Sequence, residues 1–439
     1  MRPSSSGAAA SGDSRAPETA ANVAETADKT AETARDEPGV RRRSVLTAGV
    51  AGVFAGLSGC LGDGDRSLPS TPSGSWPQHM RDGANTGATA ATAPSRGNLA
   101  WTSDAFTRWP PVAVDDEVYV GNVDPSPGPK VVALDATDGS ERWRVDIEEA
   151  GHYTSAVVGD YLVAAYGDRV VALDRESGDR EWTETLSGTL SYTEITAVPA
   201  ESLVLIPRRS GGEGGLTALD AATGEERWAE PLPGSVEDPP AVRGDGVFVA
   251  ADSALYRLDI ADGSEAWRRN VGSVALGPSA TAAGLLVAAD GDLAVRDPDT
   301  GDRLRALDGY DGEVHGVAVA DGTAYWLTDE RLAAVDVANG TEVWRLDAAG
   351  SQEGLCVGRE TVVAPVRYEG FDLETAWPAV AAFDRDTGDV RWYYHIDGFD
   401  VMFTTPPVLV DGAVYVAANT IDAVGALGDV PPSDESGLL

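Results

Sequence analysis

The chain has 439 residues, of which 71 are Asp or Glu and 33 are Lys or Arg, so its formal net charge is −38. Such an acidic surface repels phosphate, which argues against nucleic acid as a partner. It suits a host living in near-saturating salt, where the Debye length is about 3 Å or less and hydrated carboxylates keep a protein soluble.

Residues 1–59 are predicted to be a leader followed by an export signal. Residues 1–40 are rich in Ala, Thr and Glu and show no core pattern, so they are either a disordered leader or the result of a start codon placed too early. Arg42 and Arg43 precede an apolar run that ends at Ser58 and is too short to span a membrane. The arginine pair resembles a twin-arginine signal.

The segment Leu57-Ser58-Gly59-Cys60 resembles a lipobox. We therefore expect Cys60 to become the lipidated first residue of the mature chain and to anchor it on the outer face of the cell membrane. The alternative is an ordinary small residue near a cleavage site. Residues 60–75 are predicted to be a flexible Gly/Ser/Pro/Asp tether, 76–428 the folded domain and 429–439 a disordered tail.

A short phrase repeats along residues 101–392 at a spacing near 40 residues. A hydrophobe precedes an Asp, a Gly follows four residues later, and a Trp follows four residues after the Gly. One copy, Asp297…Gly301, has Arg305 in place of the Trp, and Trp101 stands at the front without its own Asp and Gly upstream. The tryptophans at these positions are Trp101, Trp143, Trp182, Trp228, Trp267, Trp344 and Trp392.

Each period contains four short hydrophobic runs separated by Gly, Asp and Asn, which predicts four antiparallel strands joined by hairpins. Four strands in about 40 residues describe one blade of a β-propeller. The last unit has three strands, and Leu99-Ala100-Trp101 supplies a fourth. The predicted fold is therefore an all-β, eight-bladed propeller whose last blade is closed by the N-terminal strand near Trp101, leaving no open edge.

The repeated tryptophans are interpreted as structural docking residues. One ring at a fixed place in each repeat, near a small Ala such as Ala133 or Ala218, suits packing between neighbouring blades. The Asp caps the turn through its side chain, and the Gly accepts the positive φ that closes it.

The phrase Ala218-Leu219-Asp220-Ala221-Ala222-Thr223-Gly224-Glu225-Glu226-Arg227-Trp228 resembles the tryptophan-docking motif of the pyrroloquinoline-quinone (PQQ) repeat family. The segment Trp76-Pro77…Arg81-Asp82…Asn85-Thr86-Gly87 resembles the N-terminal segment of PQQ-like lipoproteins, including the lipoprotein of the outer-membrane assembly complex (BamB type). This resemblance covers roughly residues 76–428. It implies the fold but not the activity, because the family holds quinoprotein dehydrogenases as well as non-enzymatic scaffolds.

The dehydrogenases of that family carry an adjacent cysteine pair over the quinone and acidic ligands for Ca²⁺. This chain has two cysteines, Cys60 and Cys356, far apart in the sequence. The four histidines show no metal-ligand spacing, and no nucleophile–His–acid grouping is recognisable. We expect no enzyme activity, no cofactor and no metal, and a lone buried thiol at Cys356.

Three further kinds of motif suggest ligand or modification sites, and two of them are interpreted as turns or hairpins. Gly211–Gly215 precedes a strand and not a helix, so it is an elongated hairpin and not a phosphate loop. The acid-rich segments at Asp297 and Asp384 resemble calcium loops but place Gly301 and Gly388 where an acid is required. Asn339-Gly340-Thr341 is a candidate glycosylation site on an exposed turn.

The topology of a four-stranded blade predicts two different faces. The repeated Asp-Gly turns take one face, called here the Asp-Gly face. The long second-to-third hairpins, at 122–130, 208–215 and 367–377, take the other, the loop-rich face, together with the connections into the innermost strands. The candidate binding residues on the loop-rich face are Trp109, His152, Tyr153, His315 and Trp377. Trp109 and Trp377 are expected to be exposed at the rim of this face, because they lie outside the docking positions.

The sequence therefore predicts an exported, membrane-anchored, monomeric propeller that binds or assembles other exported or membrane proteins. Two alternatives stay open: a quinoprotein-type oxidoreductase, and a carbohydrate-binding propeller that uses Trp109 or Trp377.

Overall fold

The computed structural model describes residues 66–105, 107, 109–122, 130–147, 153–191, 193–210, 213–236, 238–307, 314–350, 354–368, 379–395, 405–418 and 423–431. The chain divides into two units, Met1–Gly56 and Leu57–Leu439, and every described residue belongs to the second. Arg42, Arg43 and Cys60 lie outside the described residues. Within the described ranges, no helix is long and apolar enough to cross a membrane.

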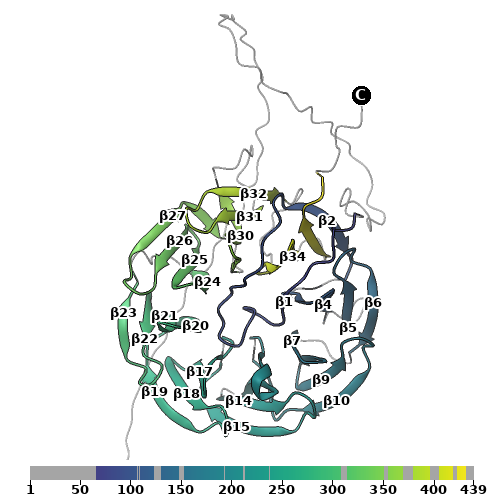
Figure 1. The fold of residues 1–439 in the computed structure, drawn as a ribbon. Coiled ribbons are helices and arrows are strands. Elements are labelled where there is room, and N and C mark those ends of the chain that lie inside the picture. Colours follow the sequence, from purple (N-terminus) through teal and green to yellow (C-terminus); the bar gives the residue numbers. More distant parts are fainter. Residues whose placement is uncertain are drawn as a thin grey trace, which may run out of the picture. The chain divides into compact units, whose positions relative to one another are not determined.

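Eight antiparallel sheets stand around a ring, which confirms the predicted propeller (Figure 1). The first four blades, each given from its inner to its outer strand, are as follows. Blade 1 has β3 (Val112–Val114), β4 (Glu117–Asn122), β5 (Lys130–Asp135) and β6 (Glu141–Asp146), with β1 (Ser75–Trp76) on its inner edge; blade 2 has β7 (Tyr153–Val158), β8 (Tyr161–Tyr166), β9 (Arg169–Asp174) and β10 (Arg180–Thr185); blade 3 has β11 (Thr189–Leu190) and β12 (Thr196–Val198), both paired with β13 (Leu203–Ser210), then β14 (Glu213–Asp220) and β15 (Glu226–Leu232); blade 4 has β16 (Ala241–Arg243), β17 (Gly246–Ala251), β18 (Ala254–Asp259) and β19 (Glu265–Asn270).

The remaining four blades repeat this order, and a 3-10 turn, η1 (Pro199–Glu201), joins β12 to β13 in blade 3. Blade 5 has β20 (Val274–Thr281), β21 (Gly284–Ala289), β22 (Asp292–Arg296) and β23 (Arg303–Ala306); blade 6 has β24 (Val314–Ala320), β25 (Thr323–Thr328), β26 (Leu332–Asp336) and β27 (Glu342–Leu346); blade 7 has β28 (Ala348–Gly350) and β29 (Cys356–Val357), both paired with β30 (Thr361–Tyr368), then β31 (Ala379–Asp384) and β32 (Val390–His395); blade 8 has β33 (Val408–Val410), β34 (Ala413–Ala418), β35 (Ala423–Gly428) and β2 (Asn98–Ser103). The three long connections of the sequence join β4 to β5, β13 to β14 and β30 to β31, so all are second-to-third hairpins, as predicted.

Each docking tryptophan joins its blade to the next one. Its indole N–H donates to the backbone carbonyl that follows the Asp position of the neighbouring turn, and its ring covers the Gly of that turn. A Cβ on Gly224, for example, would lie 2.7 Å from Cε3 of Trp182, so the ring has room only over a glycine. The donor–acceptor distances are 3.2 Å for Trp101 to Ala136, 2.7 Å for Trp143 to Arg175, 3.1 Å for Trp182 to Ala221, 2.8 Å for Trp228 to Ile260, 3.2 Å for Trp267 to Pro298, 2.9 Å for Trp344 to Arg385 and 2.6 Å for Trp392 to Pro94.

Arg305 replaces the missing indole at the junction of blades 5 and 6. Its Nη1 donates to the carbonyl of Val337 at 3.1 Å and also to that of Ala338. A guanidinium supplies the hydrogen-bond donor of the lost indole, but it lacks the flat apolar ring that covers a glycine elsewhere.

The junction of blades 7 and 8 corrects the expectation that Trp101 lacks its own turn. Gly97, four residues before Trp101, has φ +63°, and a Cβ there would lie 2.1 Å from the ring of Trp392. The capping carboxylate comes from the other end of the chain, because Asp429 accepts hydrogen bonds from Ser95 Oγ at 2.8 Å and from the N–H of Arg96 at 2.9 Å. The two chain ends therefore build one docking turn together.

The chain ends pack more extensively than the predicted boundaries allow. Arg66 donates from its backbone N–H to the carbonyl of Ala100 at 2.9 Å, and Leu68 is 4% exposed within the core of blades 8 and 1. On the C-terminal side, Asn98 donates to the carbonyl of Val430 at 2.7 Å. Residues 66–75, expected to belong to the tether, and 429–431, expected to belong to the tail, are thus parts of the propeller.

Candidate functional site

The N-terminal segment 73–92, called here the strap, crosses the middle of the ring (dark segment in Figure 1). Carbonyls of the strap accept hydrogen bonds from the innermost strands of successive blades. Each donor N–H lies at the same place in its blade, opposite the second residue of the next strand. The pairs are Val157 to Pro77 at 2.7 Å, Val242 to Gly83 at 2.5 Å, Ala280 to Ala84 at 2.7 Å, Val319 to Thr86 at 2.7 Å and Val357 to Gly87 at 2.9 Å.

The strap also reaches the remaining three blades. β1 pairs with β3 of blade 1, with Trp76 opposite Ala113. In blade 3 the side-chain amide of Gln78 acts as a peptide group, since it accepts from the N–H of Ala197 at 2.5 Å and donates to the carbonyl of Ala197 at 3.4 Å. In blade 8 the N–H of Gly412 donates to Thr92 at 2.9 Å. The strap therefore contacts the innermost strands of seven blades and the turn between β33 and β34 of blade 8. These bonds give partners to backbone groups that would otherwise be unpaired there.

A tight turn at residues 80–87 forms the middle of the strap. Asp82 Oδ1 accepts from the N–H groups of Ala84 at 3.1 Å and Thr86 at 3.0 Å. Asn85 is 5% exposed, and its Nδ2 donates to the carbonyls of Pro239 in blade 4 and Pro278 in blade 5, at 2.9 and 3.2 Å. The Asp82 carboxylate therefore caps the turn from within, and the Asn85 amide ties it to two neighbouring blades.

Against this turn lies a pocket, called here the funnel pocket. The strap forms its floor with His79, Met80 and Asn85. Its walls come from the innermost strands of blades 5 and 6 and from segments that lead into the innermost strands of blades 4, 7 and 8. They include Asp238, Pro239, Leu276, Pro278, Ser279, His315, Val317 and Pro406.

The funnel pocket combines mostly apolar walls with two imidazoles, from His79 and His315. On its other side His79 borders a smaller cavity next to Trp109, Tyr153 and Glu194, with its Nδ1 3.8 Å from Glu194 Oε1. Apolar walls with a few polar groups suit an organic ligand or a protruding side chain of a partner. Within the described ranges, no group of three or more His, Cys, Asp or Glu residues could hold a metal ion.

The structure separates the candidate binding residues of the loop-rich face. His315 lines the funnel pocket. Trp109, expected to be exposed at a rim, is half-buried and packs against the core between blades 1 and 2. Tyr153 is 2% exposed, because its ring lies against the backbone of Gly121, and burial raises its pKa. His152 and Trp377 lie outside the described residues.

Sequence reasoning missed the floor residues His79, Met80 and Asn85. These residues lie in the segment from Trp76 to Gly87, which resembles the N-terminal segment of PQQ-like lipoproteins. The segment has no repeat period, and its position is set by contacts with blades distant in sequence.

The remaining motifs have structural places. The turn at Asp384 uses its Oδ1 to accept from the N–H groups of Asp386 and Thr387, each at 3.0 Å, as a capped turn does. Asn339 is exposed, and its Oδ1 accepts from the N–H of Thr341 at 2.9 Å, so the glycosylation candidate lies on an accessible turn. Cys356 is fully buried in β29, and burial raises the pKa of its thiol.

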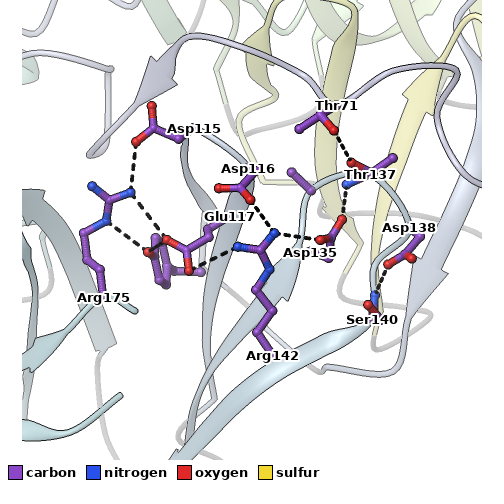
Figure 2. Close-up of polar contacts among 12 residues, drawn as sticks. Thr71, Asp115, Asp116, Glu117, Asp135, Thr137, Asp138, Ser140, Arg142 and Arg175 are labelled. Atoms are coloured by element: carbon purple, nitrogen blue, oxygen red, sulfur yellow. Dashed lines mark hydrogen bonds and ion pairs between the residues drawn. The ribbon is translucent and has the colours of Figure 1, made fainter. Parts of the chain in front are cut away.

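Ion pairs on the Asp-Gly face join residues within blade 1 and across the junction of blades 1 and 2 (Figure 2). Arg142 lies between Asp116 and Asp135, with Nη2 at 2.6 and 2.7 Å from their carboxylates, and its hydrogen bond lowers the pKa of Asp116. Arg175 reaches from the turn of blade 2 to Asp115 and Glu117 of blade 1, at 3.2 and 3.4 Å. The charged groups at this junction are thus engaged within the protein.

By its fold the protein is an eight-bladed β-propeller with a pocket whose floor is the strap. Comparison with known proteins shows its family. Residues 85–205, 168–326 and 305–430 match the family described as outer membrane protein assembly factor BamB, and the chain belongs to this family of PQQ-like propellers.

One curated relative is the serine/threonine-protein kinase AfsK of Streptomyces coelicolor, 30% identical over 122 residues. The match covers 28% of this chain and 15% of the kinase, so the chain spans a small part of that relative's length.

Several solved structures share the fold. Quinohemoprotein alcohol dehydrogenase ADHIIG from Pseudomonas putida HK5 has a TM-score of 0.61 at 15% identity, over 83% of this chain and 82% of the enzyme. The computationally designed protein Ika8 has a TM-score of 0.60 at 17% identity, over 76% of this chain and 99% of the design. At these identities the likeness establishes the fold alone.

Proposed function

We propose that this propeller is exported, anchored by a lipid on Cys60, and acts outside the cytoplasm as a monomeric scaffold that binds other exported or membrane proteins. The family carries the description outer membrane protein assembly factor BamB, and this supports a role in protein assembly over catalysis. The net charge of −38 supports a host in near-saturating salt, in the manner of a halophilic archaeon, and argues against nucleic acid as a partner.

The funnel pocket is the observation that carries the proposal. It is mostly apolar, closed at its floor by the strap, walled by residues of five blades, and it lies on the side of the ring that carries the long second-to-third hairpins. Long connections carry function more often than short turns. The opposite face consists of repeated Asp-Gly turns whose side chains cap their own backbone or pair across blades. Partner contacts are therefore assigned to the loop-rich face, around His315.

The proposal includes neither a cofactor nor a reaction. The chain has two cysteines, and Cys356 is fully buried, so an adjacent reactive pair over a quinone cannot form from them. Purified protein supplied with PQQ and Ca²⁺ is expected to show no dye-linked oxidation of alcohols or sugars. Turnover under these conditions would establish the oxidoreductase alternative instead.

Export and anchoring have separate tests. Replacing Arg42 and Arg43 together with Lys should block export, and Cys60→Ser should release the mature protein from membranes into the medium, because a diacyl anchor supplies the two chains that stable attachment needs. The distribution of protein between cell, membrane and medium fractions measures both effects. Cys60→Ser protein that stays in the membrane fraction would show that another anchor holds it.

A further inference from the structure

The middle of the strap is held differently from its ends. Trp76 and Ala91 are buried in the hydrophobic core at 3% and 5% exposure. Between them, in residues 77–87, the buried polar residues are Gln78 and Asn85, at 2% and 5% exposure, and both have amide side chains. No hydrophobic side chain of residues 77–87 is fully buried, and Ala84 adds a partly buried methyl to the core of blades 4 and 5, so the strap middle depends mainly on hydrogen bonds that water can replace.

The same stretch contains left-handed backbone at residues with side chains. Met80, Arg81 and Asn85 have φ of +52°, +71° and +56°. Such conformations persist where surrounding contacts impose them. Here the contacts are the capping bonds of Asp82 and the two bonds of Asn85 to blades 4 and 5.

The ring itself closes without the strap. In seven blades the strands of the blade follow one another along the chain, and blade 8 is completed when β2 pairs with β35. The docking tryptophans join the blades at their outermost strands, whereas the strap contacts the innermost ones. Loss of strap contacts therefore leaves the structural connections of the ring intact.

We propose that residues 77–87 form a gate: they dock and undock as one cooperative unit while the blades stay folded, and the funnel pocket exists in the docked state. His79, Met80 and Asn85 form the pocket floor, so whatever binds against this floor favours the docked strap, and docking favours binding to the same extent. Gln78 and Asn85 are the positioning residues of this gate. The inference rests on the proposed function for assigning partner binding to the funnel, whereas the gate itself is testable alone.

Amide hydrogen exchange of the full propeller in high salt tests the gate, through the five N–H groups that donate to the strap. They belong to Val157, Val242, Ala280, Val319 and Val357. In the unmodified protein these amides should exchange with one shared opening free energy, below that of the middle strands β8 and β21. Exchange of all five only at the rate of the middle strands would overturn the gate, and this arm needs no variant.

Asn85→Ala then separates cooperative from local opening. Loss of the two hydrogen bonds of the Asn85 side chain should favour undocking of the strap about tenfold or more. All five backbone N–H groups should then exchange faster by that factor. Asn98→Ala is the matched control, since it removes an amide bond to Val430 outside the strap and should leave the five rates unchanged. Acceleration confined to Val242 and Ala280, next to Asn85, would refute a cooperative unit. A failure of the scaffold proposal would leave these exchange results as they are.

Discussion

Removing one docking indole should weaken the ring at a single junction, and Trp228 is the clearest case. It is 7% exposed, its N–H lies 2.8 Å from the carbonyl of Ile260 in blade 4, and a Cβ on Gly263 would lie 2.6 Å from Cε3 of its ring. The residue thus combines a buried aromatic volume with a buried hydrogen bond to the next blade.

The two contributions can be separated by two substitutions. Trp228→Ala empties a large aromatic site and should lower the free energy of unfolding by about 3–5 kcal/mol. Trp228→Phe keeps most of the apolar ring but leaves the carbonyl of Ile260 without its donor, which should cost about 1–3 kcal/mol. The difference between the two variants measures the packing of the ring.

Thermal unfolding in high salt, followed by circular dichroism, is the assay. At about 2.1 cal/mol/K per residue the entropy of unfolding of the propeller is roughly 0.7 kcal/mol/K, so Trp228→Ala should lower the midpoint by roughly 4–7 °C. An exposed outer-strand substitution, Val343→Ala, is the control and should change the midpoint by less than about 1 °C. If Trp228→Ala behaved like this control, the indole would not hold the blades together.

Three other outcomes are expected. Arg305→Trp should restore the docking motif between blades 5 and 6 and raise the unfolding midpoint by roughly 1–2 °C, as about 1 kcal/mol of aromatic packing implies; a lower midpoint would show that the site rejects an indole. Asp429→Ala should remove the cap of the shared turn and cost about 1 kcal/mol in the same assay, whereas an unchanged midpoint would make that cap unimportant. The hydrogen bond from Arg227 lowers the pKa of Asp220, so its carboxylate stabilises the fold above the ordinary pKa near 4, and this stability is lost as the pH falls through and below that value. The unfolding midpoint of Asp220→Asn should therefore fall less between pH 5 and pH 3 than that of the unmodified protein. An equal fall in both proteins would show that Asp220 does not contribute to the pH dependence of stability.

The repeat made the fold predictable because each blade obeys local rules. An Asp that caps a turn, a Gly with positive φ and a Trp four residues later lie within one short stretch, so their joint role is readable from spacing. The closure by the strand near Trp101 followed from counting strands. The structure confirms the eight-bladed propeller and this closure.

Features built from distant parts of the chain were less accessible. Asp429 caps a turn at residues 95–97, more than 300 positions away in sequence, so no local pattern links them. The strap has no period, and its contacts with successive blades exist only once the ring has closed. The exposure of Trp109 was misjudged because its ring packs against the core between blades 1 and 2, a contact that spacing does not encode.

Site-specific photo-crosslinking in cells at native salt tests the scaffold proposal most directly. One variant carries a photoreactive amino acid at His315, in the wall of the funnel pocket, and a matched one carries it at Asp138, exposed on the Asp-Gly face. The proposed function predicts covalent adducts with exported or membrane proteins from position 315 and none from position 138. Adducts from position 138 with none from position 315 would place the partners on the opposite face and contradict the proposal.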